Sequence, residues 1–168
     1  MKKIISSLVI ALVFLVGCSS PTKSIEESDY ILVVGKSLDN ITLNDQFGNP
    51  HKIDENTKKV IVAFSKDMAH LCNDYFDTKS PTYLSDNNTQ FIADVSSAPS
   101  LIRSLFIMPG LEDFKHTVLL LTDEDTALAY KASLSTEKII VVYLENKLIT
   151  DIKTINTELE LKETIEAN

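Results

Sequence analysis

Residues 59–64, with the sequence Lys-Val-Ile-Val-Ala-Phe, constrain the fold of this chain more than any other stretch. The run is almost continuously apolar and rich in β-branched side chains. It lacks the polar alternation of a strand that faces solvent on one side. We therefore predict a central strand that is buried on both faces. Such a strand needs a covering layer on each side of its sheet, which favours an α/β domain.

The residues after this strand alternate between helical and extended patterns. Met68, Leu71, Cys72 and Tyr75 share one stripe at helical spacing, and Asp67 is placed to cap the start of that helix. The other predicted strands span residues 90–95, 117–121, 138–144 and 148–155. This alternation predicts a mixed sheet with helices packed on it.

Cap residues mark the ends of a second long helix. Ser96 and Ser97 stand where a helix can begin, and Pro99 fits its first turn. Pro109-Gly110 is expected to end the helix, because proline removes a backbone donor and glycine favours helix termination.

Two hairpins are also predicted. The first joins residues 41–43 to residues 51–53, and the second turns at residues 145–147. After the second hairpin, Thr157 and Glu160 form a capping box that opens the last helix.

This order of elements resembles the thioredoxin fold, and two stretches resemble its peroxiredoxin-like and thiol-reductase-like members. The first is Thr-Leu-Asn-Asp-Gln-Phe-Gly at residues 42–48, followed by the strand that ends at Phe64. The second is Leu-Thr-Asp-Glu-Asp at residues 121–125, followed by Ala129-Tyr130. The resemblance implies a thioredoxin-like α/β domain over residues 30–168, with a mixed central sheet flanked by helices and preceded by an N-terminal β-hairpin.

In these families the reactive cysteines stand at the start of the helix after the first central strand. There the helix dipole and free N–H groups stabilise a thiolate. The resemblance places Ala69 at the first cysteine of the reductase Cys-x-x-Cys pattern and Cys72 at the second. Dithiol exchange needs the attacking thiol that is missing here. We therefore expect no catalytic residue, and we expect Cys72 to be a core residue on the apolar stripe of its helix.

A one-cysteine thiol peroxidase, or another oxidoreductase-like enzyme that uses Cys72, is the alternative. Cys72 coincides with the peroxidatic position of the family pattern Pro-x-x-x-Thr-x-x-Cys, and His70 and the helix start would support a lowered thiol pKa. Ser65 replaces the proline of that pattern and Ala69 replaces the threonine. Arg103 stands in the second helix rather than where the family places its thiolate-stabilising arginine.

A further departure concerns the loop before the strand at residues 138–144. The thioredoxin fold carries a cis-proline there, which shapes the substrate groove, whereas residues 132–137 read Ala-Ser-Leu-Ser-Thr-Glu. A cis peptide bond without proline costs about 2.5–4 kcal/mol. We therefore expect a trans loop around Thr136 and an altered groove.

The amino terminus predicts secretion and lipidation. A pair of lysines precedes a run over residues 4–16 that is apolar except for Ser6 and Ser7, and it is shorter than the roughly 20 residues of a membrane-spanning helix. Leu15-Val16-Gly17-Cys18 resembles the lipobox of bacterial lipoproteins, in which the cysteine thiol accepts a diacylglycerol. Residues 1–17 are therefore predicted to be a signal peptide, and Cys18 the lipidated first residue of the mature protein.

Residues 18–29 are predicted to form the lipidated cysteine and a flexible tether, because polar residues and Pro dominate them. Ser19, in place of an aspartate after the cysteine, favours the outer membrane in the Gram-negative lipoproteins that this segment resembles. The expected partners are the membrane, reached through the lipid on the periplasmic face, and a protein of the cell envelope. With Cys18 acylated, Cys72 is the one thiol left, and an internal disulfide is excluded.

Charge and composition exclude several functions. The net charge is −8, and removing the signal leaves 14 basic against 24 acidic residues, a net charge of −10. Nucleic acids require a basic face, so no nucleic-acid partner is expected. No glycine-rich phosphate loop is present, and we expect no cofactor. Copper delivery is a weaker alternative, because Cys72 with His51, His70 and His116 falls short of the usual ligand sets.

Overall fold

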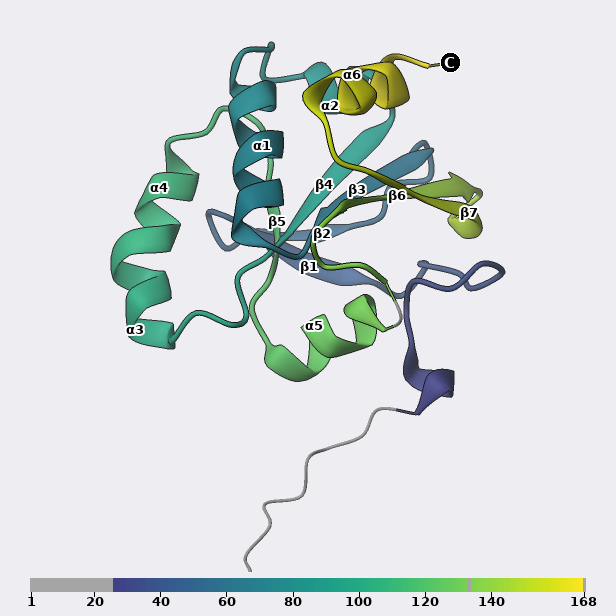
Figure 1. Ribbon diagram of the computed structural model, residues 1–168, viewed down its shortest axis with the longest axis horizontal. Helices are drawn as coiled ribbons and strands as arrows, with labels where there is room; N and C mark the ends of the chain where they lie inside the picture. Colours follow the sequence, from purple (N-terminus) through teal and green to yellow (C-terminus); the bar gives the residue numbers. More distant parts are fainter. Residues whose placement is uncertain (1–25, 133, 168) are drawn as a thin grey trace, which may run out of the picture.

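The computed structural model describes residues 26–132 and 134–167. Its strands are β1 (Thr42–Asp45), β2 (Pro50–Lys52), β3 (Lys59–Ala63), β4 (Thr89–Asp94), β5 (Leu119–Leu121), β6 (Ile139–Glu145) and β7 (Leu148–Ile155). They form one seven-stranded sheet in the order β2-β1-β5-β4-β3-β6-β7 (Figure 1). Strands β3, β4 and β5 are parallel, and the other pairings are antiparallel. The predicted mixed sheet and N-terminal hairpin are confirmed.

Strand β3 is buried along its whole length, as its sequence predicts. Its neighbours are β4, which places Phe91 beside Ile61, and β6, which places Val141 beside Ile61. Because side chains alternate along a strand, Val60 and Val62 enter one hydrophobic cluster and Ile61 enters the other. The sheet therefore has a packed layer on both faces.

The helices are α1 (Lys66–Asp77), α2 (Tyr83–Asp86), α3 (Ser100–Ile102), the π-helical η2 (Arg103–Ile107), α4 (Met108–Glu112), α5 (Glu124–Lys131) and α6 (Glu158–Glu166), with a short 3-10 turn η1 (Glu27–Asp29). Helices α1, α2, α4 and α6 supply buried side chains to the cluster on one face of the sheet. Helix α5 and the irregular segment containing Leu32 and Leu38 cover the other face. Figure 1 shows α5 well separated from the group formed by α1, α4 and α6.

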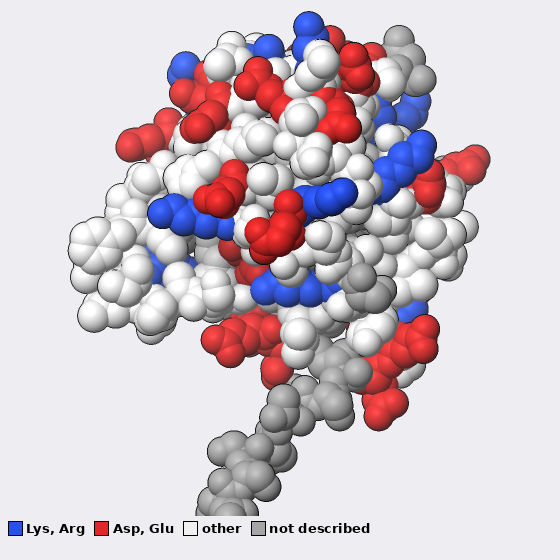
Figure 2. All heavy atoms as spheres, viewed as in Figure 1, with Lys and Arg blue, Asp and Glu red and all other residues white. Residues whose placement is uncertain are grey.

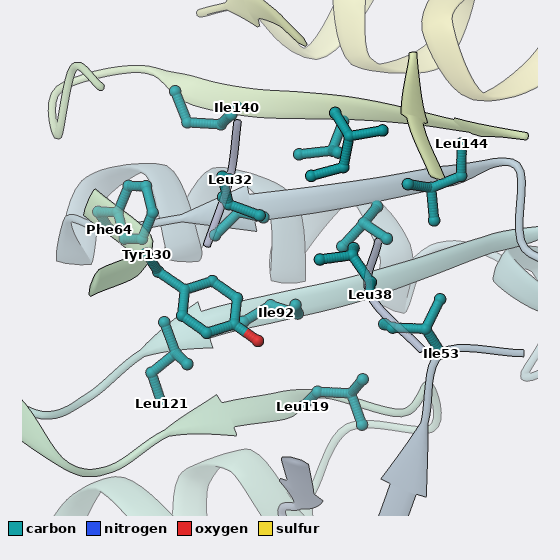
Figure 3. Close-up of a cluster of buried hydrophobic side chains, with 14 of the residues drawn as sticks. Leu32, Leu38, Ile53, Phe64, Ile92, Leu119, Leu121, Tyr130, Ile140 and Leu144 are labelled. Carbon is teal, nitrogen blue, oxygen red and sulfur yellow. The ribbon is translucent and has the colours of Figure 1, made fainter. Parts of the chain in front are cut away.

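The cluster beneath α5 surrounds the ring of Tyr130, which is 1% exposed (Figure 3). Phe64 and Leu121 lie beside that ring, and Ile92 lies close to its hydroxyl end. The Tyr130 hydroxyl has no hydrogen-bond partner among the described residues. Burial raises the pKa of this phenol, so it stays protonated and neutral inside the core.

The start of α1 differs from the prediction. Ser65 is the N-cap, and its hydroxyl oxygen accepts a hydrogen bond from the backbone N–H of Met68 at 3.4 Å. Asp67 lies inside the first turn instead. The reason is that Ser65 has the extended backbone that a cap requires, whereas the helix already begins at Lys66.

The end of the second helix also differs, because Pro109-Gly110 lies within α4 and does not end it. The π-helical turn explains this continuation. The N–H of Met108 donates to the carbonyl of Arg103, five residues back, and Pro109 then occupies the first turn of α4, where its missing N–H costs no regular helical bond.

The first residue that the structure describes is residue 26. The predicted signal peptide, the lipidated Cys18 and most of the tether therefore lie outside the described residues. Within residues 26–132 and 134–167, no helix has the length and apolar character required to cross a bilayer. Leu32 and Leu38, which follow the predicted tether, are already buried in the core.

Candidate functional site: the carboxyl ends of the parallel strands

The carboxyl ends of β3, β4 and β5 meet at one edge of the sheet, which is where open α/β sheets usually bind ligands. Helix α1 begins at this edge, directly after β3. Its first turn carries a Ser65 cap and presents Lys66 and Asp67 to solvent. His70, in the next turn, is also exposed. This end of α1 therefore has the dipole and free N–H groups that stabilise an anion, but it carries no thiol.

Cys72 lies deeper, on the face of α1 that packs against the sheet. Its exposure is 0%, and it shares a cluster with Ile61, Ala63 and Phe76. Burial raises the pKa of the thiol, because the apolar surroundings disfavour the charged thiolate. The structure thus places Cys72 in the core, where the sequence expects it, in surroundings that favour the protonated thiol over the thiolate.

The loop before β6 directly follows the end of α5. No peptide bond among the described residues is cis. Ala132, which ends α5, has a φ of 42° and a ψ of −119°, a backbone conformation that is strained for a residue other than glycine. The residue before it, Lys131, is held by an ion pair.

That ion pair joins the end of α5 to the end of β4. Lys131 Nζ lies 2.5 Å from Asp94 Oδ2, and the other carboxylate oxygen accepts a hydrogen bond from the backbone N–H of Ser96. The Asp94 side chain is 1% exposed, whereas that of Lys131 is 25% exposed. Sequence reasoning missed this pair. The only signal for it is an aspartate at the last position of β4, directly after the three apolar residues at positions 91–93.

Arg103 lines an open groove of about 490 Å³ at the same edge, between the β4–α3 and β5–α5 connections. Its guanidinium Nη1 donates to the carbonyls of Val95, at 3.2 Å, and Thr122, at 2.9 Å. The wall of the groove is polar, with hydroxyl groups from the residues before α3 and acidic residues from the start of α5. Arg103 therefore ties two loops together and does not stand beside the thiol of Cys72.

The three histidines have separate environments. His51 Nε2 lies 2.8 Å from Asp45 Oδ2 in the turn of the first hairpin. His116 is buried, its Nε2 lies 2.9 Å from Asn73 Oδ1, and its Nδ1 has no hydrogen-bond partner in the described chain. No three His, Cys, Asp or Glu side chains of residues 26–132 and 134–167 are placed to share a metal ion.

Burial also affects the charge state of His116. Its ring packs against Phe76, Phe91 and Phe114, with centroid distances of 5.2–6.4 Å. These surroundings disfavour the imidazolium and lower the pKa of His116 to about 4. At neutral pH this histidine is an uncharged part of the core.

Known structures identify the fold. A putative protein disulfide isomerase from Bacteroides thetaiotaomicron superimposes with a TM-score of 0.52 at 13% identity, over 82% of this chain and 88% of that one. The thioredoxin domain of a thiol-disulfide oxidoreductase from Bacteroides vulgatus gives 0.51 at 18% identity, over 80% and 96% of the two chains. A peroxidoxin from Mycobacterium tuberculosis gives 0.51 at 12% identity, over 79% and 93%. The chain has a thioredoxin-like fold.

No protein-family model and no curated sequence matches the chain. The likeness is therefore one of backbone architecture, and the chemistry of this thioredoxin-like domain follows from its own side chains. At the edge of its sheet, Ser65 caps the start of α1, the buried carboxylate of Asp94 pairs with Lys131, and Arg103 donates hydrogen bonds to carbonyl groups.

Proposed function

We propose that this chain is a lipid-anchored protein of the bacterial cell envelope whose thioredoxin-like domain binds or scaffolds a partner without thiol chemistry. The observation that carries the proposal is the complete burial of Cys72. With Cys18 acylated, no other thiol exists in the mature chain. A thiolate is the species that attacks a disulfide or a peroxide, and the core disfavours it here.

The surroundings of α1 support the same proposal. In the families that the sequence resembles, the first reactive cysteine of the reductase pattern would stand at Ala69. The proline of the peroxidatic pattern would stand at Ser65, and the threonine that helps to hold the peroxide would stand at Ala69. Here Ser65 caps the helix, and Ala69 is partly buried and packs against the core. The first turn therefore offers no nucleophile for disulfide exchange.

The redox part of the proposal is tested with the chain that lacks residues 1–18. Both hydrophobic clusters lie between residues 32 and 165, so the shortened chain retains the whole core. We expect it to reduce a disulfide substrate and to consume peroxide no faster than its Cys72→Ala variant. Peroxide turnover with a reductant that Cys72→Ala abolishes would instead establish the one-cysteine peroxidase.

The anchoring part is tested in a Gram-negative host. We expect mass spectrometry of the wild-type protein to find an amino-terminal acylated Cys18, and Cys18→Ala to accumulate as an unprocessed or mislocalised precursor, because lipid transfer and cleavage both depend on that thiol. Fractionation of inner and outer membranes tests the expectation from Ser19. A mature wild-type chain that begins at any other residue would contradict the anchor.

A further inference from the structure

The helical segment from α3 to α4 exposes an apolar surface. Leu101 is 66% exposed, Ile102 44%, Leu105 58% and Phe106 69%. We name these four side chains the α3–η2 face. Figure 2 shows an uncharged projection on the side of the molecule where Figure 1 places α3 and α4, while acidic and basic residues cover much of the rest of this view.

The opposite side of the same segment is also apolar. Leu111 is buried, and Ile107 and Met108 pack against the cluster that contains Cys72. A surface helix normally turns polar residues outward, and a helix that is apolar all round is normally covered. Packing within the domain therefore accounts for the inner side of this segment but not for the α3–η2 face.

The arrangement of the face suits a helical partner. Leu101 and Leu105, like Ile102 and Phe106, are four residues apart, so each pair forms a short ridge along the helix. Ridges at this spacing pack into the grooves of another helix. The one charged side chain between them, Arg103, is turned to the carbonyls of Val95 and Thr122 and leaves the ridges uncharged.

Acidic residues stand at both ends of the face. Beyond its carboxyl end, Glu112 and Asp113 are exposed and outnumber the nearby exposed Lys115. At its amino end, Glu124 lines the groove that Pro99 and Ser100 share, where acidic residues outnumber Arg103. A second copy of this chain would bring acidic residues against acidic residues, whichever way the two helices ran. An anionic bilayer would be repelled for the same reason. Complementary charge comes from a partner with basic residues.

We infer that the α3–η2 face binds an amphipathic helix of a partner protein, with apolar side chains at its centre and Lys or Arg at both ends. This inference rests on the binding role proposed above and names the surface that performs it. The apolar ridges supply the buried area, and Glu112, Asp113 and Glu124 select the basic ends.

The probe is a fluorescent peptide of leucine and lysine at helical spacing, with lysines at both ends, added to the chain that lacks residues 1–18. Fluorescence anisotropy should report saturable binding that weakens as salt is added. We expect the double variant Leu105→Ser, Phe106→Ser to bind about tenfold more weakly or worse. We expect Glu112→Gln with Glu124→Gln to weaken binding about threefold.

Matched controls separate this surface from general stickiness. Leu159→Ser removes a leucine of α6 that is 64% exposed, and it should leave binding unchanged. A peptide with glutamate in place of lysine should bind far more weakly. All variants alter exposed side chains, and circular dichroism confirms that they are folded before their affinities are compared.

Four results would overturn the inference. Two concern the peptide: the lysine peptide shows no saturable binding, or the wild type and the Leu105→Ser, Phe106→Ser variant bind it equally. The third is that the wild type sediments as a dimer and this variant as a monomer. The fourth is that the wild type floats with phosphatidylglycerol vesicles and this variant does not. None of them bears on thiol chemistry. A negative result here and a positive peroxidase assay are therefore distinct outcomes.

Discussion

The first turns of α1 and the α3–η2 face belong to helices on the same side of the sheet, yet they differ in what they leave exposed. Around α1 the one described thiol is buried, and the helix start is capped by Ser65. On the α3–η2 face, four large apolar side chains are exposed and no reactive group stands among them. The domain thus buries its thiol on α1 and exposes its apolar side chains on the α3–η2 face, which is the contrast that the proposed binding role requires.

The strongest way to break this comparison is to truncate one phenylalanine in each region. Phe76 of α1 is 2% exposed and makes edge-to-face contacts with Phe91 and His116. Phe76→Ala should lower the free energy of unfolding by about 3–5 kcal/mol, because it leaves a cavity in the core. Phe106→Ala should change it by less than about 0.5 kcal/mol. Urea denaturation measures both, and equal losses would show that the α3–η2 face is packed.

The second prediction concerns pH and the buried aromatic cluster. Burial lowers the pKa of His116 from 6.5 in the unfolded chain to about 4 in the folded one. Between these values the unfolded chain binds more protons, so the free energy of unfolding falls as the pH is lowered from 6.5 towards 4. The loss is about 3 kcal/mol, and the contribution is fully present above pH 6.5.

His116→Gln isolates this effect, because it removes the titrating ring, and its stability should vary less over the same interval. His70→Gln serves as the control, since His70 is exposed, and it should retain the wild-type profile. Parallel profiles for wild type and His116→Gln would contradict the assignment.

A third prediction tests Cys72 as a packing residue. Cys72→Ser places a hydroxyl group on a fully buried apolar position and should cost on the order of 1–3 kcal/mol of stability. The wild-type thiol should resist a thiol reagent until the protein unfolds. An unchanged melting temperature together with rapid labelling of the native protein would place Cys72 among reactive cysteines instead.

The smallest expected effect is an increase in the free energy of unfolding. The Tyr130 hydroxyl is buried without a hydrogen-bond partner in the described part of the chain. Tyr130→Phe should therefore raise the free energy of unfolding by about 1 kcal/mol. Leu128→Ala, on the exposed side of the same helix, should change it little. A loss of stability in Tyr130→Phe would mean that the hydroxyl has a partner after all.

Short-range patterns in the sequence predict much of the fold. The buried strand β3 follows from its β-branched run, and the capping box of α6 follows from Thr157 and Glu160, whose reciprocal bonds are present. The N-terminal hairpin is confirmed, with strands displaced by one to two residues from the predicted ones. The short helix α2 was not predicted, because its four residues carry no periodic signal.

Errors arose where neighbouring residues compete for one role. Ser65 and Asp67 are both good caps, and the strand that precedes them decides which has an extended backbone. Pro109 is a strong signal for a helix end, but the π-helical turn before it removes the bond that a proline would break.

The sequence by itself determined the scarcity of thiols, the acidic charge and the alternation of strands and helices, because composition and local periodicity depend only on near neighbours along the chain. The tertiary structure decided that Lys131 meets Asp94, that His116 meets Asn73 and that the α3–η2 face is left exposed. The residues of each of these pairs are far apart in sequence. Their proximity depends on how the strands pair and on which helix covers each face of the sheet, and no local pattern records either.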